Sequence, residues 1–69
     1  MTIPEQEKLI GQFDGNYLLA KMYLLSMRGA IDRLAVDYPG LEKNIPELAE
    51  LTDGLNKVWQ KIHKELDKE

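Results

Sequence analysis

The side chains that could carry out chemistry are few and stand apart in the sequence. His63 is the one histidine, so a metal site would need carboxylates alone around it, and the Glu-x-x-His spacing of helical two-metal sites is absent. We expect His63 to be solvated and loosely paired with Asp67, one helical turn further on. Ser26 has no base at a recognisable spacing, so nucleophilic catalysis has no support. We therefore expect no enzymatic activity, no metal and no cofactor.

A second group of side chains has the chemistry of an anion site. It contains two cations one heptad apart, Lys21 and Arg28, with the aromatic residues Tyr17, Tyr23 and Trp59. A planar phosphorylated ligand could stack on the aromatic rings while the cations neutralise its charge. In the alternative interpretation, the stems of the two cations cover apolar surface and their charges pair with acids on a neighbouring helix.

Helices must position these side chains, because apolar residues recur with helical spacing along most of the chain. In the first half the apolar positions alternate steps of three and four residues without a slip: Ile10, Phe13, Tyr17, Ala20, Leu24, Met27, Ile31, Leu34 and Tyr38. The same spacing returns in Leu48, Leu51, Leu55, Val58 and Ile62, with Trp59 and Leu66 beside them. This is the heptad spacing of a coiled-coil seam. It predicts an all-α antiparallel helical hairpin.

Two similar segments predict where the helices begin. In each, a capping side chain, Thr2 or Asn44, is followed by an apolar residue, a proline and a glutamate. The capping oxygen can accept from a free amide of the first turn, and the glutamate suits the positive end of the helix dipole. The sequence Tyr38-Pro39-Gly40 ends the first helix. We expect one domain, 1–69, with helices at about 4–37 and 45–67 and a turn at 38–44.

Turn-forming residues at 14–16 leave the course of the first helix open. Asp14-Gly15-Asn16 is typical of turns, yet the apolar seam passes through it unbroken. An unbroken first helix would extend past the second by roughly ten residues, or ~15 Å. A break at Gly15 would match the lengths and give a three-helix bundle. Between these alternatives the unbroken seam favours the hairpin.

The first helix carries more apolar surface than one seam requires. The surplus lies opposite the seam, at Leu18, Met22 and Leu25, next to the small Gly29. We predict that these residues form an interface. Three arrangements would cover them: self-association into a dimeric four-helix bundle, a chain segment before Gly15 folded over them, or another protein.

Composition limits the partners. The chain has 69 residues, no cysteine and a net charge of -3. A core this small needs support, and without disulfides the support is self-association or a partner. Mixed charges of slightly acidic balance argue against direct nucleic-acid binding. The apolar run at 17–27 contains Lys21 and is shorter than the roughly 20 residues of a membrane span. With no pattern of a secretory signal, we expect a cytoplasmic protein that does not bind membranes.

These observations favour binding over catalysis. In size and pattern the chain is similar in outline to small dimeric helical-hairpin regulators, with which it shares no motif, so the resemblance concerns the fold alone. We expect a small interaction or regulatory protein, homodimeric, that binds or inhibits a larger protein through an apolar helix face. The alternative is an oligomeric sponge for a small anionic, nucleotide-like ligand.

Overall fold

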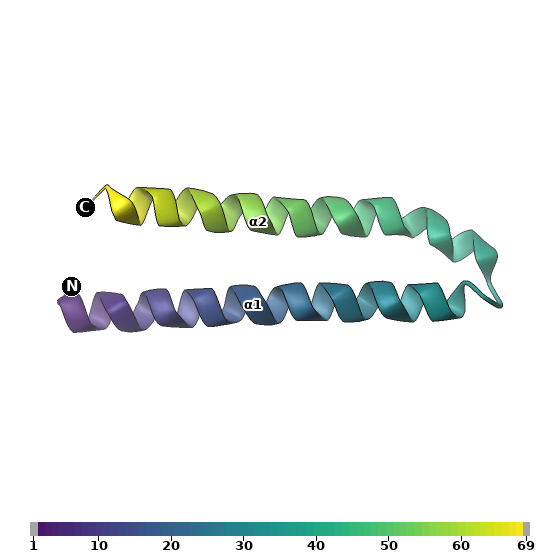
Figure 1. Ribbon diagram of the computed structural model, residues 1–69, viewed down its shortest axis with the longest axis horizontal. Helices are drawn as coiled ribbons and strands as arrows, with labels where there is room; N and C mark the ends of the chain where they lie inside the picture. Colours follow the sequence, from purple (N-terminus) through teal and green to yellow (C-terminus); the bar gives the residue numbers. More distant parts are fainter. Residues whose placement is uncertain (1, 69) are drawn as a thin grey trace.

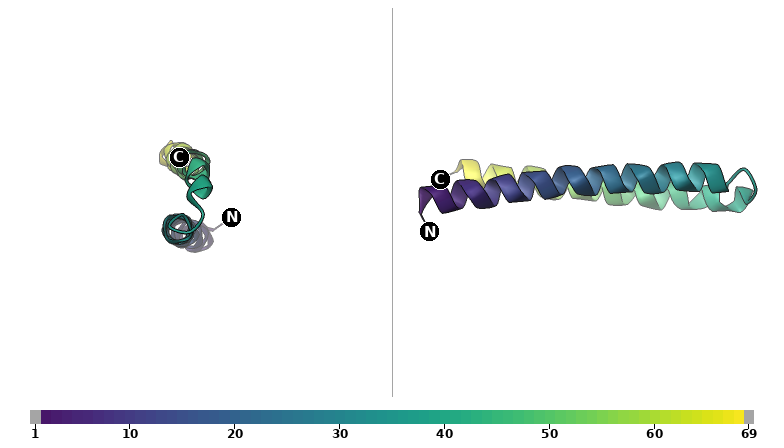
Figure 2. Two further views of the ribbon diagram at one scale, coloured as in Figure 1. Left: turned by 90° about the vertical axis from the view of Figure 1, so that its right-hand side faces the viewer. Right: turned by 90° about the horizontal axis from the view of Figure 1, so that it is seen from below.

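The two halves of the chain form an antiparallel helical hairpin. The computed structural model describes residues 2–68. Helix α1 (Ile3–Leu34) and helix α2 (Ile45–Asp67) are joined by a bend and a short 3₁₀ helix, η1 (Pro39–Asn44). The helices lie side by side, with the start of α1 and the end of α2 at the same end of a rod that extends 53 × 17 × 11 Å (Figures 1 and 2). The predicted all-helical hairpin is confirmed.

The two helices begin in different ways. At α1 the Thr2 hydroxyl accepts from the Glu5 amide at 3.3 Å, and the Glu5 carboxylate accepts from the Thr2 amide at 3.4 Å. This capping box fulfils the prediction for Thr2. The predicted cap at Asn44 is wrong, because η1 runs directly into α2 and the backbone of Asn44 is already helical. Its side chain instead donates to the Leu41 carbonyl at 3.2 Å.

Helix α1 passes through Gly15 without a break, so the alternative three-helix bundle is wrong. It ends at Leu34, three residues before the expected end, where the amides of Asp37 and Tyr38 both donate to the Leu34 carbonyl at 3.1 and 2.9 Å. Helix α1 has 32 residues and α2 has 23. The 3₁₀ helix leads into α2 and, at about 2 Å per residue, compensates for much of the difference in length. The expected overhang is therefore nearly absent (Figure 1).

The side chains between the helices differ from the predicted seam on α2. Two are buried, Ala35 at 6% exposure and Leu48 at 7%. The partly buried positions of α2 are Ile45, Thr52, Leu55, Asn56, Trp59, His63 and Leu66. Several predicted seam residues are instead exposed: Met27, Leu34, Tyr38, Leu51, Val58 and Ile62. Helix α2 is thus turned so that Trp59 and His63 face α1, and Leu51 and Val58 face outward.

Replacing Gly15 by alanine is expected to raise the free energy of unfolding by about 0.5 to 1 kcal/mol, because glycine is a poor helix former. A Cβ atom at this position would meet no other atom within 4 Å. Urea denaturation followed by circular dichroism measures the change. A loss of stability in Gly15→Ala would show that the chain bends at this residue.

Neither helix offers a membrane-spanning segment within residues 2–68, since none of their stretches is both long and apolar enough.

Candidate functional site

A polar and aromatic cluster joins the two helices between the middle of the hairpin and its open end. The Asp14 carboxylate accepts from the Trp59 indole N–H at 3.0 Å and from His63 Nε2 at 2.6 Å. One turn further along α1, the Tyr17 hydroxyl donates to the Asn56 side-chain oxygen. These hydrogen bonds cross from one helix to the other and fix how the two are aligned. The predicted pairing of His63 with Asp67 is therefore wrong.

The aromatic rings of the same cluster pack in a continuous row. The Trp59 ring lies 5.2 Å from Tyr17 in a stacked arrangement and 4.4 Å from His63 in a tilted one. His63 also contacts Phe13, with ring centroids 6.2 Å apart. Ring contacts at these distances stabilise a fold beyond the apolar area that they bury. The cluster therefore works as a latch between the helices, and its only histidine is occupied in it.

The latch also fixes the charge of Asp14. The hydrogen bond from His63 lowers the pKa of Asp14 below its ordinary value of 3.8, an effect that partial burial opposes and that the Trp59 hydrogen bond and the charge of His63 reinforce. The carboxylate therefore stays ionised to lower pH in the folded chain than in the unfolded chain. As an ion it can only accept, so His63 Nε2 carries the proton of their hydrogen bond.

We expect Asp14→Asn to lower stability at neutral pH and to matter less in acid. Because the folded-state pKa of Asp14 is depressed, its contribution is complete above about pH 5 and disappears as pH falls through the folded-state pKa. Urea midpoints of parent and variant should therefore converge below pH 3.8. The matched control is Asp32→Asn, at an exposed position of the same helix. The Asp32→Asn variant should lose stability in acid to the same extent as the parent chain. A parent–variant difference that is equal at all pH values would exclude the ionised latch.

The structure brings together only part of the predicted anion site. Lys21 lies over the Tyr17 ring, 5.4 Å from its centroid, and Tyr17 stacks on Trp59. Tyr23 is 69% exposed, and its position on α1 is turned away from Lys21 by roughly 160°. Arg28 lies two turns beyond Lys21, at the rim of a separate hollow. The facing sides of the Tyr17 and Trp59 rings are already in contact, so they offer no open slot between them.

The predicted interface residues form a ridge on α1 that is exposed at three positions and half-buried at Gly29. Leu18, Met22 and Leu25 are exposed by 59, 63 and 63%, and Gly29 lies one turn after Leu25. We call these four residues the α1 ridge. Beside Leu25, side chains of both helices line a small hollow: Leu24, Leu25, Arg28, Leu48, Ala49 and Thr52. The ridge and the hollow lie next to each other on this side of the hairpin.

The other side of the hairpin carries a second apolar surface, most of which the sequence had assigned to the seam. On α1 it contains Leu9, Met27 and Leu34, and on α2 it contains Leu51, Val58 and Ile62, with exposures between 38 and 63%. We call these six residues the broad face. Met27 lies 18 residues after Leu9 and 7 before Leu34, and Leu51 lies 7 residues before Val58 and 11 before Ile62. Residues separated by 7, 11 or 18 positions lie on the same side of an α-helix. A hollow lined by Asn16, Ala20, Leu55 and Val58 connects the two helices on this side.

Few side chains within residues 2–68 are arranged so that they could bind a metal ion or act as a nucleophile. No three side chains of His, Cys, Asp or Glu come together there in a group that could hold a metal ion. Ser26 lies about 18 Å along α1 from Asp14, the residue that holds His63. Comparison of the chain with known protein families, with curated proteins and with solved structures finds no match. The latch, the α1 ridge and the broad face are the features of the described residues that bear on function.

Proposed function

We propose that this protein is a small, non-enzymatic interaction protein that binds, and thereby regulates, a larger protein through the α1 ridge. It does so as a homodimer in which two hairpins form a four-helix bundle. The observation that carries the proposal is the imbalance of apolar surface. Fourteen large apolar or aromatic side chains are exposed, whereas only Ala35 and Leu48 are buried, among the residues described.

The absence of an enclosed core among the described residues of a single hairpin supports the homodimer. No described side chain is less than 2% exposed, so the chain has no fully enclosed core. A domain of this size gains little from burial even when it is well packed, and there is no cysteine for a disulfide. Pairing of two hairpins supplies the missing core with the surface that is already apolar.

The α1 ridge is suited to a different kind of contact. It is apolar on α1 alone, because the neighbouring positions of α2 on that side include Asp53 and Gln60. Such a narrow strip matches one amphipathic helix of another protein, with a large side chain of that helix in the hollow beside Leu25. The unbranched Met22 side chain adapts readily to the shape of a partner.

The use of His63 supports binding over catalysis. Its Nε2 atom is engaged with Asp14 at 2.6 Å, and its ring packs on Trp59. A histidine held in this way maintains the alignment of the helices. The hydrogen bonds and ring contacts of the latch thus have a sufficient structural purpose.

The proposal is tested by affinity capture from cells of the source organism. We expect a stoichiometric protein to be retained by the parent chain and lost with Met22→Glu. The control Gln60→Glu adds the same charge at an exposed position of α2 and should retain it. Circular dichroism and sedimentation verify that both variants keep the fold and mass of the parent.

Two results would contradict this function. One is capture that does not depend on Met22. The other is the absence of a protein, together with a co-purifying nucleotide-like anion that is lost in the double variant Lys21→Glu, Arg28→Glu. That second result would establish the anionic-ligand alternative in its place.

A further inference from the structure

The side of α1 that belongs to the broad face has no charged residue between Leu9 and Leu34. Between Leu9 and Leu34 this side of α1 also contains Gln12, Asn16, Ala20, Tyr23 and Ala30. Charged residues of this described stretch lie on its other sides. An uncharged strip about 37 Å long is unusual on a helix that faces water on this side. It is of the length and chemistry that helices bury against one another in a bundle.

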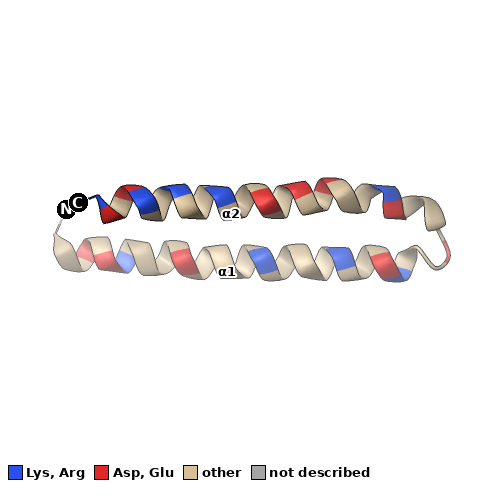
Figure 3. Ribbon diagram, turned by 45° about the horizontal axis from the view of Figure 1, so that its top comes forward, with Lys and Arg blue, Asp and Glu red and all other residues tan. Residues whose placement is uncertain are grey.

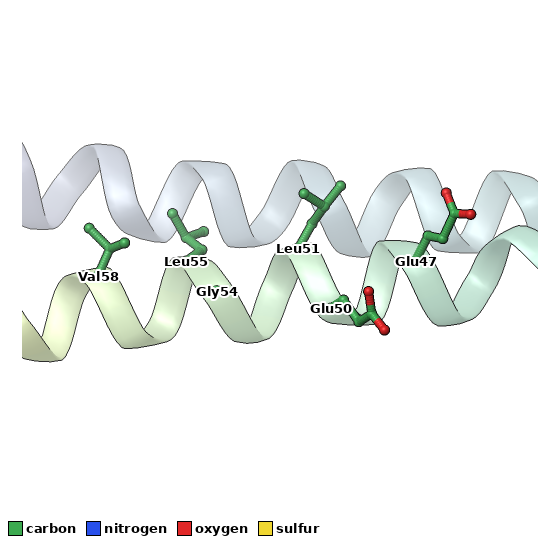
Figure 4. Close-up of a pocket in the computed structure, with 6 residues that line it drawn as sticks. All are labelled: Glu47, Glu50, Leu51, Gly54, Leu55 and Val58. Atoms are coloured by element: carbon green, nitrogen blue, oxygen red, sulfur yellow. The ribbon is translucent and has the colours of Figure 1, made fainter.

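The α2 half of the broad face borders a groove at a glycine. The groove is lined by Glu47, Glu50, Leu51, Gly54, Leu55 and Val58. In Figure 4 the side chains of Leu51, Leu55 and Val58 project from one side of α2, and Gly54, which has no side chain, leaves a gap beside them. A Cβ atom at Gly54 would meet no other atom of the chain within 4 Å. The gap therefore serves no contact within the hairpin, and it would let another helix approach closely.

The charges of α2 are separated along the helix. Glu47, Glu50 and Asp53 precede Gly54, and Lys57, Lys61 and Lys64 follow it, before the acidic residues Glu65 and Asp67 of the last turn. Figure 3 shows this order on α2 as a red stretch, then a blue stretch, then further red at the C-terminal end. Gly54 lies near the boundary of the first two stretches. Over residues 47–61, a second α2 placed antiparallel across this point meets opposite charges, whereas a parallel copy meets like charges.

We propose that the broad face is covered by a second copy of this chain, with α2 antiparallel to α2 and the twofold axis passing beside Gly54. The proposal rests on the homodimer of the proposed function and specifies its arrangement. The axis places Leu51 against Val58 of the second copy and Glu47 beside Lys61 of the second copy. Twofold symmetry forms each of these contacts twice. Neither Glu47 nor Lys61 takes part in the ion pairs that join described residues within the chain.

The same twofold axis also covers the uncharged strip of α1. The latch contacts between Tyr17 and Trp59 set the level of α1 against α2, and they place Gly54 close to the level of Met22. Rotation about an axis at this level brings Leu9 of one chain near Leu34 of the other. The uncharged strip of α1 is then buried against its own copy, antiparallel. All neighbouring helices of the resulting four-helix bundle are antiparallel, and the α1 ridge stays on the outside.

Two charge reversals test this arrangement. Glu47→Lys and Lys61→Glu each replace both attractive contacts by repulsive ones, so each variant alone should dimerise on the order of tenfold more weakly than the parent. Mixing the two variants restores attraction at both contacts, because position 47 and position 61 then carry opposite charges wherever the two chains meet. Native mass spectrometry of the equimolar mixture should therefore show the heterodimer well above the one-half expected from random pairing. High salt should reduce the preference.

The control is Lys8→Glu, which makes the same charge change at an exposed position on the outer side of α1. It should dimerise as the parent does, and circular dichroism checks that all variants stay helical. A dimeric parent whose variants dimerise normally and mix at random would overturn this arrangement and leave the proposed homodimer intact. A monomeric parent would overturn both.

Discussion

Replacing Leu48 by alanine is expected to lower the free energy of unfolding by about 3 kcal/mol, the usual cost of removing a buried leucine side chain. Leu48 is 7% exposed and is the one large side chain that the hairpin buries among its described residues. A chain of this length has a total stability on the order of 3 to 10 kcal/mol. The variant should therefore lose between about a third and all of the stability of the parent chain.

Urea denaturation followed by far-UV circular dichroism measures this loss. The matched control is Val36→Ala in the bend after α1, where the side chain is 81% exposed and the expected change is below about 0.5 kcal/mol. Equal effects of the two substitutions would mean that Leu48 is not part of a packed core. The comparison must be made at one protein concentration, because a dimer gains stability with concentration.

The second large effect is expected at Trp59. Trp59→Ala removes the stacked contact with Tyr17, the ring contact with His63 and the hydrogen bond to Asp14. We expect a loss of about 3 kcal/mol, at the lower end of values for tryptophan because the side chain is only half-buried. Without the Trp59 ring against it, Tyr17 should also become more exposed, including the hydroxyl that donates to Asn56.

A conservative variant separates the two contributions of Trp59. Trp59→Phe keeps an aromatic ring against Tyr17 but has no N–H for Asp14, so it should cost about 1 kcal/mol. Thermal and urea unfolding of the three proteins give the comparison. If Trp59→Ala costs no more than Trp59→Phe, ring packing contributes nothing and the latch is held by hydrogen bonds alone.

The helices themselves could be predicted from local signals. Thr2 caps α1 as predicted, with Glu5 completing a capping box, and the seam that ran through Gly15 corresponds to a continuous α1. The last turn of α1 could not be placed, because the apolar spacing continues to Tyr38 while the backbone turns after Leu34. The missing cap at Asn44 has a similar cause: the preceding residues form a 3₁₀ helix, which their composition did not announce.

The rotation of α2 could not be predicted from apolarity. Two stripes overlap on this helix: Leu51 and Val58 continue the more apolar one, while Thr52, Asn56 and His63 belong to the other. The structure turns the second stripe inward. The physical reason lies on α1, where Asp14 and the Tyr17 hydroxyl face the partner helix and require donors and acceptors. Asn56, Trp59 and His63 supply them.

This rotation also explains the candidate surfaces. Satisfying the polar groups of α1 leaves Leu51, Val58 and Ile62 without cover, which creates the α2 half of the broad face. The α1 ridge was predictable because Leu18, Met22 and Leu25 lie opposite the seam in either arrangement. The Asp14–His63 contact was not, because residues 49 positions apart give no local pattern.

The mass of the parent chain in solution tests the proposed homodimer most directly, because both the four-helix bundle and the covering of the broad face need a second copy. Sedimentation equilibrium at micromolar concentration should give twice the chain mass of 7.9 kDa. The helical signal should fall together with the mass on dilution, because the lone hairpin has so little core. A stable, fully helical species of 7.9 kDa would contradict the proposed homodimer.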